Sequence, residues 1–268
     1  MHKVRYPMPK TLALLLAIIA LAAPSLTHAY SNETSQAAVR LLGYRPSYAL
    51  LGRPEQKLQL SLKAKVLDGA DFYVAYTQIM FWDLFKRKSA PFTDVNYNPE
   101  AFYRFKLGSP GNLEELRWID IGYEHESNGR DQAFSRSWDR VYVLFSAESL
   151  IGHKDMRMQW SAKAWVPLDR DNTNRDILRY RGLYELNATL IDPFGPFFDR
   201  NDLTLRVYAG GKSGLDPTKG GQELTFRFNK WPERKALPMI VLQAFNGYGE
   251  GLAFYNQKRV GLRAGFGF

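Results

Sequence analysis

The sequence predicts an all-β protein, a twelve-stranded antiparallel transmembrane β-barrel of the outer-membrane type. Apolar and polar residues alternate along about twelve segments of the chain, and many segments are about ten residues long. Successive side chains of a strand point to opposite faces, so each segment has one apolar side and one polar side. A tilted strand needs about this length to cross a bilayer.

The first 29 residues have the pattern of a secretory signal peptide. Lys3, Arg5 and Lys10 form a basic start, residues 11–23 are apolar, and Ala29 offers a small side chain for cleavage. The apolar run is too short for a spanning helix, so an uncleaved anchor helix is the weaker alternative. Cleavage would lower the net charge of +9 by three.

Residues 30–45 are expected to form a periplasmic N-terminal segment, and residues 46–268 the barrel domain. Strands are expected to begin near residues 46, 57, 72, 101, 116, 137, 156, 181, 202, 221, 238 and 252. Turn-rich stretches at residues 109–112, 151–155 and 210–221 separate some of them. The even number of strands and the terminal Phe268 are typical of outer-membrane barrels.

A soluble sandwich is the alternative architecture, in which the apolar faces would meet in a core. The barrel is favoured because Lys, Arg, Asp and Glu occupy strand centres, as they do in a polar barrel interior. Tryptophans near strand ends agree with interface girdles, although a core would also use them. These residues are Trp82, Trp118, Trp138, Trp160 and Trp231.

The composition excludes several kinds of site and partner. There is no cysteine, so disulfides and thiolate metal sites are excluded. Only His125 and His153 follow the predicted cleavage point, which argues against a histidine-rich zinc site. The positive charges are spread singly along the chain, so nucleic acid is not an expected partner.

A candidate catalytic triad lies on two neighbouring predicted strands. His125 and Ser127 fall on the apolar, outward face of the first strand, whereas Glu124 and Glu126 fall on its charged face. Asp139 shares the outward side of the next strand. A nucleophilic serine needs a base within reach, and the base needs an orienting acceptor. The pattern therefore predicts that Ser127, His125 and Asp139 form a triad facing lipid.

A phospholipid is the substrate that such a position would suit, because its ester lies near the headgroup boundary. The alternative is that His125 and Ser127 are ordinary residues at the wet end of a strand. The chain has no G-x-S-x-G elbow, so an α/β-hydrolase is not indicated. The GGKS sequence at residues 210–213 lacks the first glycine of a P-loop and is interpreted as a turn.

Four motifs along the chain belong together. Residues 122–140 contain H-x-S-N-G-R followed by S-R-S-W-x-R. The others are YTQ at residues 76–78, PF-x-x-x-NY-x-P at residues 91–99 and GYGE-x-L-x-x-YN-x-x-RVG at residues 247–261. In these motifs the chain resembles the bacterial outer-membrane phospholipase A family, and the likeness covers most of the chain from about residue 58, in the family's order.

The resemblance implies a calcium-dependent enzyme that is active as a homodimer in the outer membrane. It would hydrolyse acyl esters of phospholipids and lysophospholipids, with phospholipase A1 and A2 activity. Ser127 would be the nucleophile, and His125 the general base and acid. The backbone N–H of Gly129 would donate to the oxyanion.

The resemblance also implies a calcium site at the dimer interface, built from few protein oxygens. The ligands would be the carbonyl of Arg130, the hydroxyl of Ser135 and, from the other subunit, the carbonyl at the position of Ser89. The alternative is that these three residues are ordinary solvated loop residues that bind no metal. Two departures bear on the site: the family usually has asparagine where this chain has Asp139, and often aspartate where it has Gln132, with Asp131 beside it.

Gln78 is an amide within an apolar outward series, and a partner across a two-fold interface would suit it. The alternative is that Gln78 faces inward. Two rival functions also stand beside the phospholipase: a passive porin or structural barrel, and an exported soluble esterase.

Overall fold

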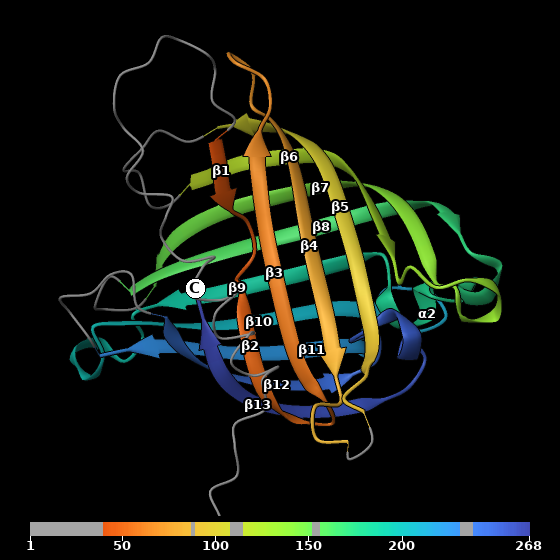
Figure 1. Ribbon diagram of the computed structural model, residues 1–268. Coiled ribbons are helices and arrows are strands. Elements are labelled where there is room, and N and C mark those ends of the chain that lie inside the picture. The colour runs from red at the N-terminus through yellow and green to blue at the C-terminus, as the bar shows by residue number, and fades with distance from the viewer. Residues whose placement is uncertain (1–39, 87–88, 108–114, 152–155, 231–237) are drawn as a thin grey trace, which may run out of the picture.

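The computed structural model describes residues 40–86, 89–107, 115–151, 156–230 and 238–268, which form one closed antiparallel barrel (Figure 1). From β2 onward each strand pairs with the next along the chain, β1 pairs with β3, and β13 pairs with β2 to close the barrel. The strands are β1 (Arg40–Gly43), β2 (Tyr48–Arg53), β3 (Gln56–Lys65), β4 (Phe72–Trp82), β5 (Phe92–Lys106), β6 (Glu115–Ser127), β7 (Ser137–Ile151), β8 (Met156–Arg170), β9 (Tyr184–Ile191), β10 (Arg200–Gly210), β11 (Asp216–Asn229), β12 (Met239–Gly247) and β13 (Arg259–Gly267).

β1 and β2 are two parts of the first of the twelve barrel strands, since both pair with β3. The break between them carries Arg45 into the lumen, where its guanidinium contacts Glu100 and Glu124. The strand expected near residue 46 therefore starts earlier, at Arg40. The predicted signal peptide, residues 30–39 of the predicted periplasmic segment, residues 109–112, residues 152–155 with His153, and Trp231 lie outside the described residues.

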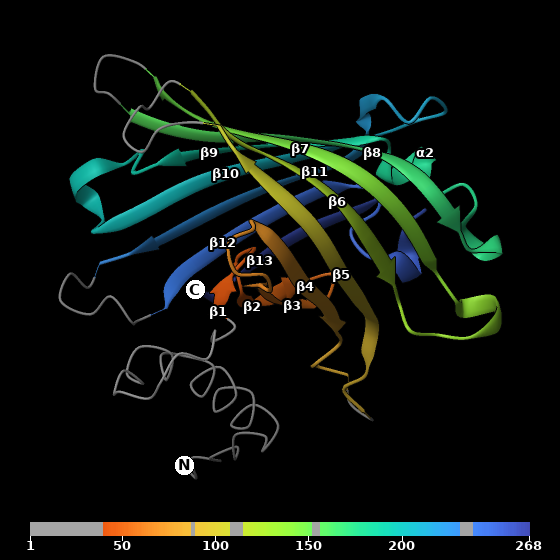
Figure 2. The same cartoon turned by 90° about the horizontal axis from the view of Figure 1, so that it is seen from above.

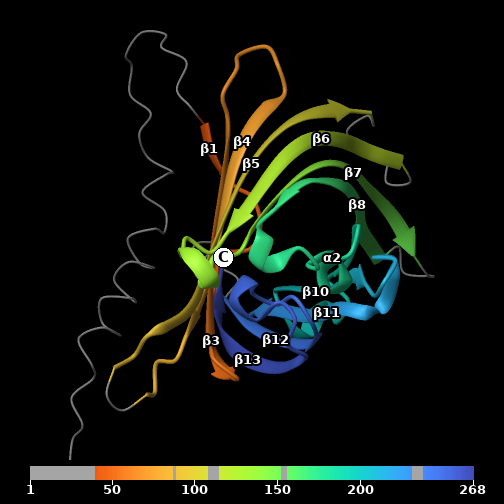
Figure 3. The same cartoon turned by 90° about the vertical axis from the view of Figure 1, so that its right-hand side faces the viewer.

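Short helices lie in the loops and turns between strands: η1 (Gln132–Phe134), η2 (Asn172–Asn174), α2 (Leu178–Arg181), η3 (Gly195–Phe197) and η4 (Leu252–Phe254). Figure 2 shows the strands running obliquely around the barrel, and Figure 3 looks onto the end that carries α2, which lies across the enclosed space. Among the described residues, no helix is long and apolar enough to cross a membrane.

The outward face of the strands is apolar and open to the surroundings. Ile121 is 55% exposed, Val166 63% and Leu262 71%. A soluble sandwich would bury these side chains in its core, whereas a membrane barrel presents them to lipid. The predicted twelve-stranded barrel is therefore confirmed, and the sandwich alternative is wrong.

The lumen is filled by buried ion pairs. Glu124, which is 1% exposed, lies 2.7 Å from Arg140 and 2.6 Å from Lys163, and it also pairs with Arg45. Further along the lumen, Lys57 lies 2.6 Å from Glu223. Such charges are tolerated in a low-dielectric interior only when they are paired and hydrogen-bonded.

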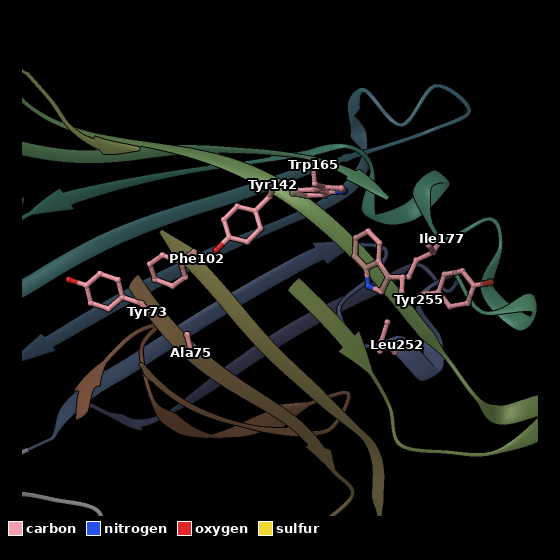
Figure 4. Packing of buried hydrophobic residues seen from close by; sticks show 9 residues of the cluster. Tyr73, Ala75, Phe102, Tyr142, Trp165, Ile177, Leu252 and Tyr255 are labelled. Atoms are coloured by element: carbon pink, nitrogen blue, oxygen red, sulfur yellow. The ribbon is translucent and has the colours of Figure 1, made fainter. Parts of the chain in front are cut away.

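Aromatic side chains complete the interior packing (Figure 4). The cluster consists of Tyr73, Ala75, Phe102, Trp138, Tyr142, Trp165, Ile177, Leu252 and Tyr255. The helix α2 and the loop before β13 thus pack on the same interior cluster as the strands.

The predicted tryptophan girdle is wrong for three residues. Trp138 has no exposed surface, because its position alternates inward together with Arg140, whose guanidinium lies 3.8 Å from the ring centre. Trp118 stacks under Arg104 at 4.4 Å, and Trp82 is buried with its N–H donated to Ala90. Trp160 is 39% exposed on the outward face, as a girdle residue would be.

Three further strand starts differ from the prediction, those of β5, β11 and β13. β11 begins at Asp216 rather than near residue 221, within the stretch 210–221 that was expected to be a turn. β5 begins at Phe92 rather than near residue 101; its inward side is polar, with Asp94 buried. β13 begins at Arg259 rather than near residue 252, because η4 folds inward first. The Leu252 N–H donates to Asn96 Oδ1 at 3.1 Å, which holds η4 against β5.

We expect the substitution Glu124→Gln to lower the free energy of unfolding by about 3 kcal/mol, since three cations would lose a buried counter-charge. Urea titration of the barrel in detergent would measure it. The matched control is Asp68→Asn in the exposed turn after β3, which should change little. Equal stability of both variants would contradict a stabilising role for the network.

Candidate active site

The register of β6 and β7 places His125 directly opposite Asp139. His125 Nδ1 lies 2.8 Å from Asp139 Oδ1, a hydrogen-bonding distance. The His125 side chain is 33% exposed and that of Asp139 21%, while the neighbouring Glu124 and Glu126 are buried in the lumen. The two residues therefore meet on the outward side of the sheet.

Ser127 lies two residues beyond His125 on the same face, about 6.6 Å further along the strand. It pairs with Tyr97 on β5 and Ser137 on β7. Within the described part of the chain, the Ser127 hydroxyl has no hydrogen-bond partner. Catalytic hydrogen bonds are often long in unliganded enzymes and tighten around substrate. The three predicted triad residues thus share one small region of the outward face.

A buried amide fixes the backbone beneath the histidine. The Asn98 side chain on β5 is 4% exposed and donates to the His125 carbonyl at 2.8 Å. Sequence reasoning assigned no role to Asn98, although it lies in the NY-x-P motif at residues 96–99. That motif was the available signal.

The loop that follows Ser127 is organised by Asn128. Its Oδ1 accepts the N–H groups of Arg130 at 3.3 Å and Arg136 at 3.0 Å, and its Nδ2 donates to the Phe134 carbonyl at 2.9 Å. This buried side chain replaces the hydrogen bonds that a continuing strand would have supplied. Asn128 is a second residue whose function sequence reasoning missed.

Gly129 occupies a position that no other residue fits well. Its φ is +62°, and an added Cβ would lie 2.8 Å from Cε2 of Tyr97. No acceptor among the described residues takes its N–H. The N–H two residues beyond Ser127, the predicted nucleophile, is therefore a free donor among the described residues, as the oxyanion prediction requires.

The predicted calcium ligands lie in loops at this end of the barrel. The Arg130 side chain donates to the Thr93 carbonyl at 2.6 Å, which joins its loop to β5. The Ser135 hydroxyl donates to Asp171 Oδ2 at 2.7 Å, so its oxygen lone pairs are left to accept. Ser89 is exposed in the loop between β4 and β5.

Asp171 is a carboxylate beside this site that sequence reasoning did not assign. Hydrogen bonds from the Thr173 N–H and hydroxyl, and then from Ser135, hold the pKa of Asp171 below its ordinary value. It is therefore a negative charge next to the Ser135 hydroxyl.

The donor set suits a hard cation better than a transition metal. Among the residues that the structure describes, no group of three histidine, cysteine or carboxylate side chains could hold a metal. Carbonyl and hydroxyl oxygens such as those of Arg130 and Ser135 are ligands that calcium accepts. Asp131 and Gln132, at the position of the sequence departure, are both exposed.

An open pocket of about 510 Å³ lies at the connection between β6 and β7. It is lined by Gly129, Arg130, Asp131 and Phe134. Its lining combines a cation, an anion and an aromatic ring.

Tyr123, two residues before His125 on the outward face of β6, is a further residue of the site, and sequence reasoning gave it no role. Its hydroxyl donates a hydrogen bond to Asp139 Oδ1, the oxygen that also contacts His125.

Comparison with known proteins gives a consistent result. The family model for phospholipase A1 matches residues 21–268. Phospholipase A1 of Escherichia coli K12 is 31% identical over 220 residues, covering 78% of this chain and 68% of the relative. A protein named as a putative phospholipase A1 of Neisseria meningitidis is 31% identical over 234 residues, covering 81% of this chain and 55% of the relative.

Two solved structures share the fold. The outer membrane phospholipase A from Escherichia coli is 26% identical, with a TM-score of 0.72 over 85% of this chain and 98% of that one. A Salmonella typhi outer membrane phospholipase dimer with bound calcium is 25% identical, with a TM-score of 0.72 over 87% and 94%.

We expect Gly129→Ala to slow labelling of Ser127 by a fluorophosphonate probe about tenfold or more. A Cβ at positive φ costs about 1–2 kcal/mol and here also meets Tyr97, so the loop and its free N–H must shift. The rate of labelling measures this. Gly69→Ala is the control, since Gly69 has φ +75° but open space around its Cβ position. Unchanged labelling of Gly129→Ala would refute the role of this loop.

Proposed function

The chain belongs to the phospholipase A1 family, and we propose that its lipid-facing Ser127, His125 and Asp139 hydrolyse acyl esters of phospholipids and lysophospholipids. As a member, it is a phospholipase and an outer-membrane β-barrel. The observation that carries the proposal is the 2.8 Å contact of His125 with Asp139, on the face and strand that also carry Ser127.

The residues would act as a serine hydrolase acts. Ser127 Oγ attacks the ester carbonyl while His125 Nε2 takes its proton, and the lysolipid alcohol leaves with that proton. Water then releases the fatty acid from the Ser127 ester, with His125 again as base. Asp139 accepts the Nδ1–H of His125 and so leaves Nε2 basic. The Gly129 N–H donates to the oxyanion.

The position of the site suits a substrate that stays in the membrane. Ser127 ends β6, where the apolar outward face meets the loops, and a phospholipid ester lies at this boundary. The substrate can diffuse sideways to the triad without leaving the bilayer. The filled lumen argues against the porin alternative, since buried ion pairs around Glu124 cross it. Activity on both acyl positions, A1 and A2, is part of the proposal.

Calcium is the proposed cofactor, held by the Arg130 carbonyl, the Ser135 hydroxyl and the carbonyl of Ser89 from a second copy of the chain. Support comes from the oxygen donors and from the calcium-bound dimer of the Salmonella typhi relative. When bound, calcium supplies positive charge close to the developing oxyanion.

A homodimer is the proposed active form, and Gln78 is the residue that motivates it. Gln78 lies on the outward side of β4 in step with the exposed Val74, but it is not without a partner as expected: Tyr76 donates to its Oε1 at 3.0 Å. Its amide donors are left for an acceptor on another subunit. Dimer formation and calcium binding would then complete the same site.

We expect wild-type protein in mixed micelles to hydrolyse phospholipid with calcium and to stop when calcium is chelated. Ser127→Ala should insert and fold normally yet lose several orders of magnitude of activity, since the serine oxygen is the attacking atom. Fatty-acid release measures both results. Retention of a tenth of the activity by Ser127→Ala would refute the assignment, and full activity of a chelated monomer would refute the calcium-bound dimer.

We expect Asp139→Asn to keep activity within about tenfold of wild type, because an amide oxygen can also accept the His125 N–H. The acid limb of its pH–rate profile should move to lower pH, since protonated His125 loses a nearby carboxylate. Asp139→Ala should be far less active, because His125 then lacks its orienting acceptor. In serine proteases the exchange to asparagine costs roughly 10⁴ through the wrong tautomer. Equal damage from both substitutions would count against this account.

A further inference from the structure

We propose that Tyr123 is a positioning residue of the active site, whose hydroxyl holds Asp139 and reduces the charge that Asp139 presents to His125. This inference rests on the proposed function, because it assigns Asp139 the task of orienting the catalytic base. Nothing in the sequence motif around His125 requires a tyrosine at this place.

The geometry places Tyr123 next to the His125–Asp139 pair. Tyr123 precedes His125 by two residues on β6 and pairs with Val141, two residues beyond Asp139 on β7. Its hydroxyl reaches diagonally across the hairpin and donates to Asp139 Oδ1. His125 Nδ1 contacts the same oxygen at 2.8 Å. One carboxylate oxygen is therefore held by two groups of the neighbouring strand.

The surroundings explain why both polar groups need this contact. Around Tyr123 the outward face consists of apolar side chains, Ile121 and Val141 among them. A phenol hydroxyl or a carboxylate that faces lipid without a hydrogen-bond partner destabilises the folded protein. Each supplies the partner that the other needs.

Few other charges surround the pair. Asp169 on β8 lies opposite Asp139, and Tyr97 on β5 lies opposite Ser127. Glu124, Glu126 and Arg140 lie on the lumen side of the same sheet and are buried there. Among the described residues, His125 alone forms an ion pair with Asp139. Within the described part of the chain, the carboxylate therefore has no cation other than protonated His125 to offset its charge.

Asp139 has two effects on His125: it orients the ring, and its negative charge stabilises the protonated ring. The hydrogen bond from Tyr123 weakens the second effect and leaves the first. A donated hydrogen bond withdraws negative charge from Oδ1, so the carboxylate stabilises the imidazolium less. The carboxylate still accepts the Nδ1–H and keeps the ring in place. Activity is therefore expected to extend to lower pH than it would if Asp139 lacked this hydrogen bond. The effect requires a charged partner and disappears if residue 139 is an amide.

The test is a pH–rate profile of phospholipid hydrolysis in mixed micelles at saturating calcium. Tyr123→Phe is compared with wild type, and the same exchange is made in the Asp139→Asn background. We expect Tyr123→Phe alone to move the acid limb to higher pH by about 0.5–1 pH unit. On the alkaline plateau its rate should be close to that of wild type. In the Asp139→Asn background it should leave the acid limb in place.

Tyr103→Phe is the matched control. Tyr103 lies on the outward face of β5 opposite Ile121, is exposed like Tyr123, and its hydroxyl has no hydrogen-bond partner among the described residues. It should match wild type over the whole pH range. Heat-modifiable migration on a gel verifies that each variant is folded.

A purely structural role of Tyr123 would lower the rate at every pH and equally in both backgrounds. That result, or an unmoved acid limb in Tyr123→Phe, would overturn the inference while wild type remained active and Ser127→Ala inactive. Failure of the proposed function would instead be seen as Ser127-independent hydrolysis, or as none in wild type. The two failures are thus told apart by the same set of proteins.

Discussion

Every side chain of the barrel strands faces either lipid or a narrow lumen, because strand residues alternate and the sheet closes on itself. Neither environment tolerates an unpaired charge. The lumen meets this constraint by bringing carboxylates and cations of different strands together, as Glu124 does with Arg140 and Lys163. The outward face meets it by being mostly apolar and by pairing polar groups with one another, as Gln78 does with Tyr76 and His125 with Asp139.

The same constraint gives the site its rigidity. On the lumen side of β6, Glu126 accepts hydrogen bonds from Trp138 and Arg140 on β7 and from Arg181 at the end of α2. The inward half of the strand is thereby fixed to its neighbours. His125 and Ser127 belong to the same strand, so their backbone is held in place as well, while their side chains remain accessible on the outward face. A catalytic group held by a packed scaffold loses little freedom when substrate binds.

The strand alternation allowed much of the site to be predicted from the sequence. It places His125, Ser127 and Asp139 on one face, and the short connection between β6 and β7 makes the strands neighbours. The cross-strand contact of His125 with Asp139 follows once the register is known. The alternation also indicates that the Trp138 side chain points inward. The prediction that Trp138 belongs to an interface girdle did not take this into account.

Other parts of the site depend on information that the local pattern does not contain. The hydrogen bond from Tyr123 to Asp139 needs the diagonal offset of two strands and a particular side-chain rotamer. The contact of Leu252 with Asn96 joins residues that are 156 positions apart. The inward fold of η4 was therefore hidden from any reading of neighbouring residues, and β13 was expected too early.

The most direct test of a lipid-facing serine hydrolase is to trap the acyl group on the chain. Wild-type protein would be mixed with phospholipid and calcium and quenched in acid during turnover, and its peptides would be examined by mass spectrometry. The account predicts a fatty-acyl ester on Ser127 that disappears when calcium is chelated. An acyl group on another residue, or steady hydrolysis without any acyl ester at Ser127, would contradict it.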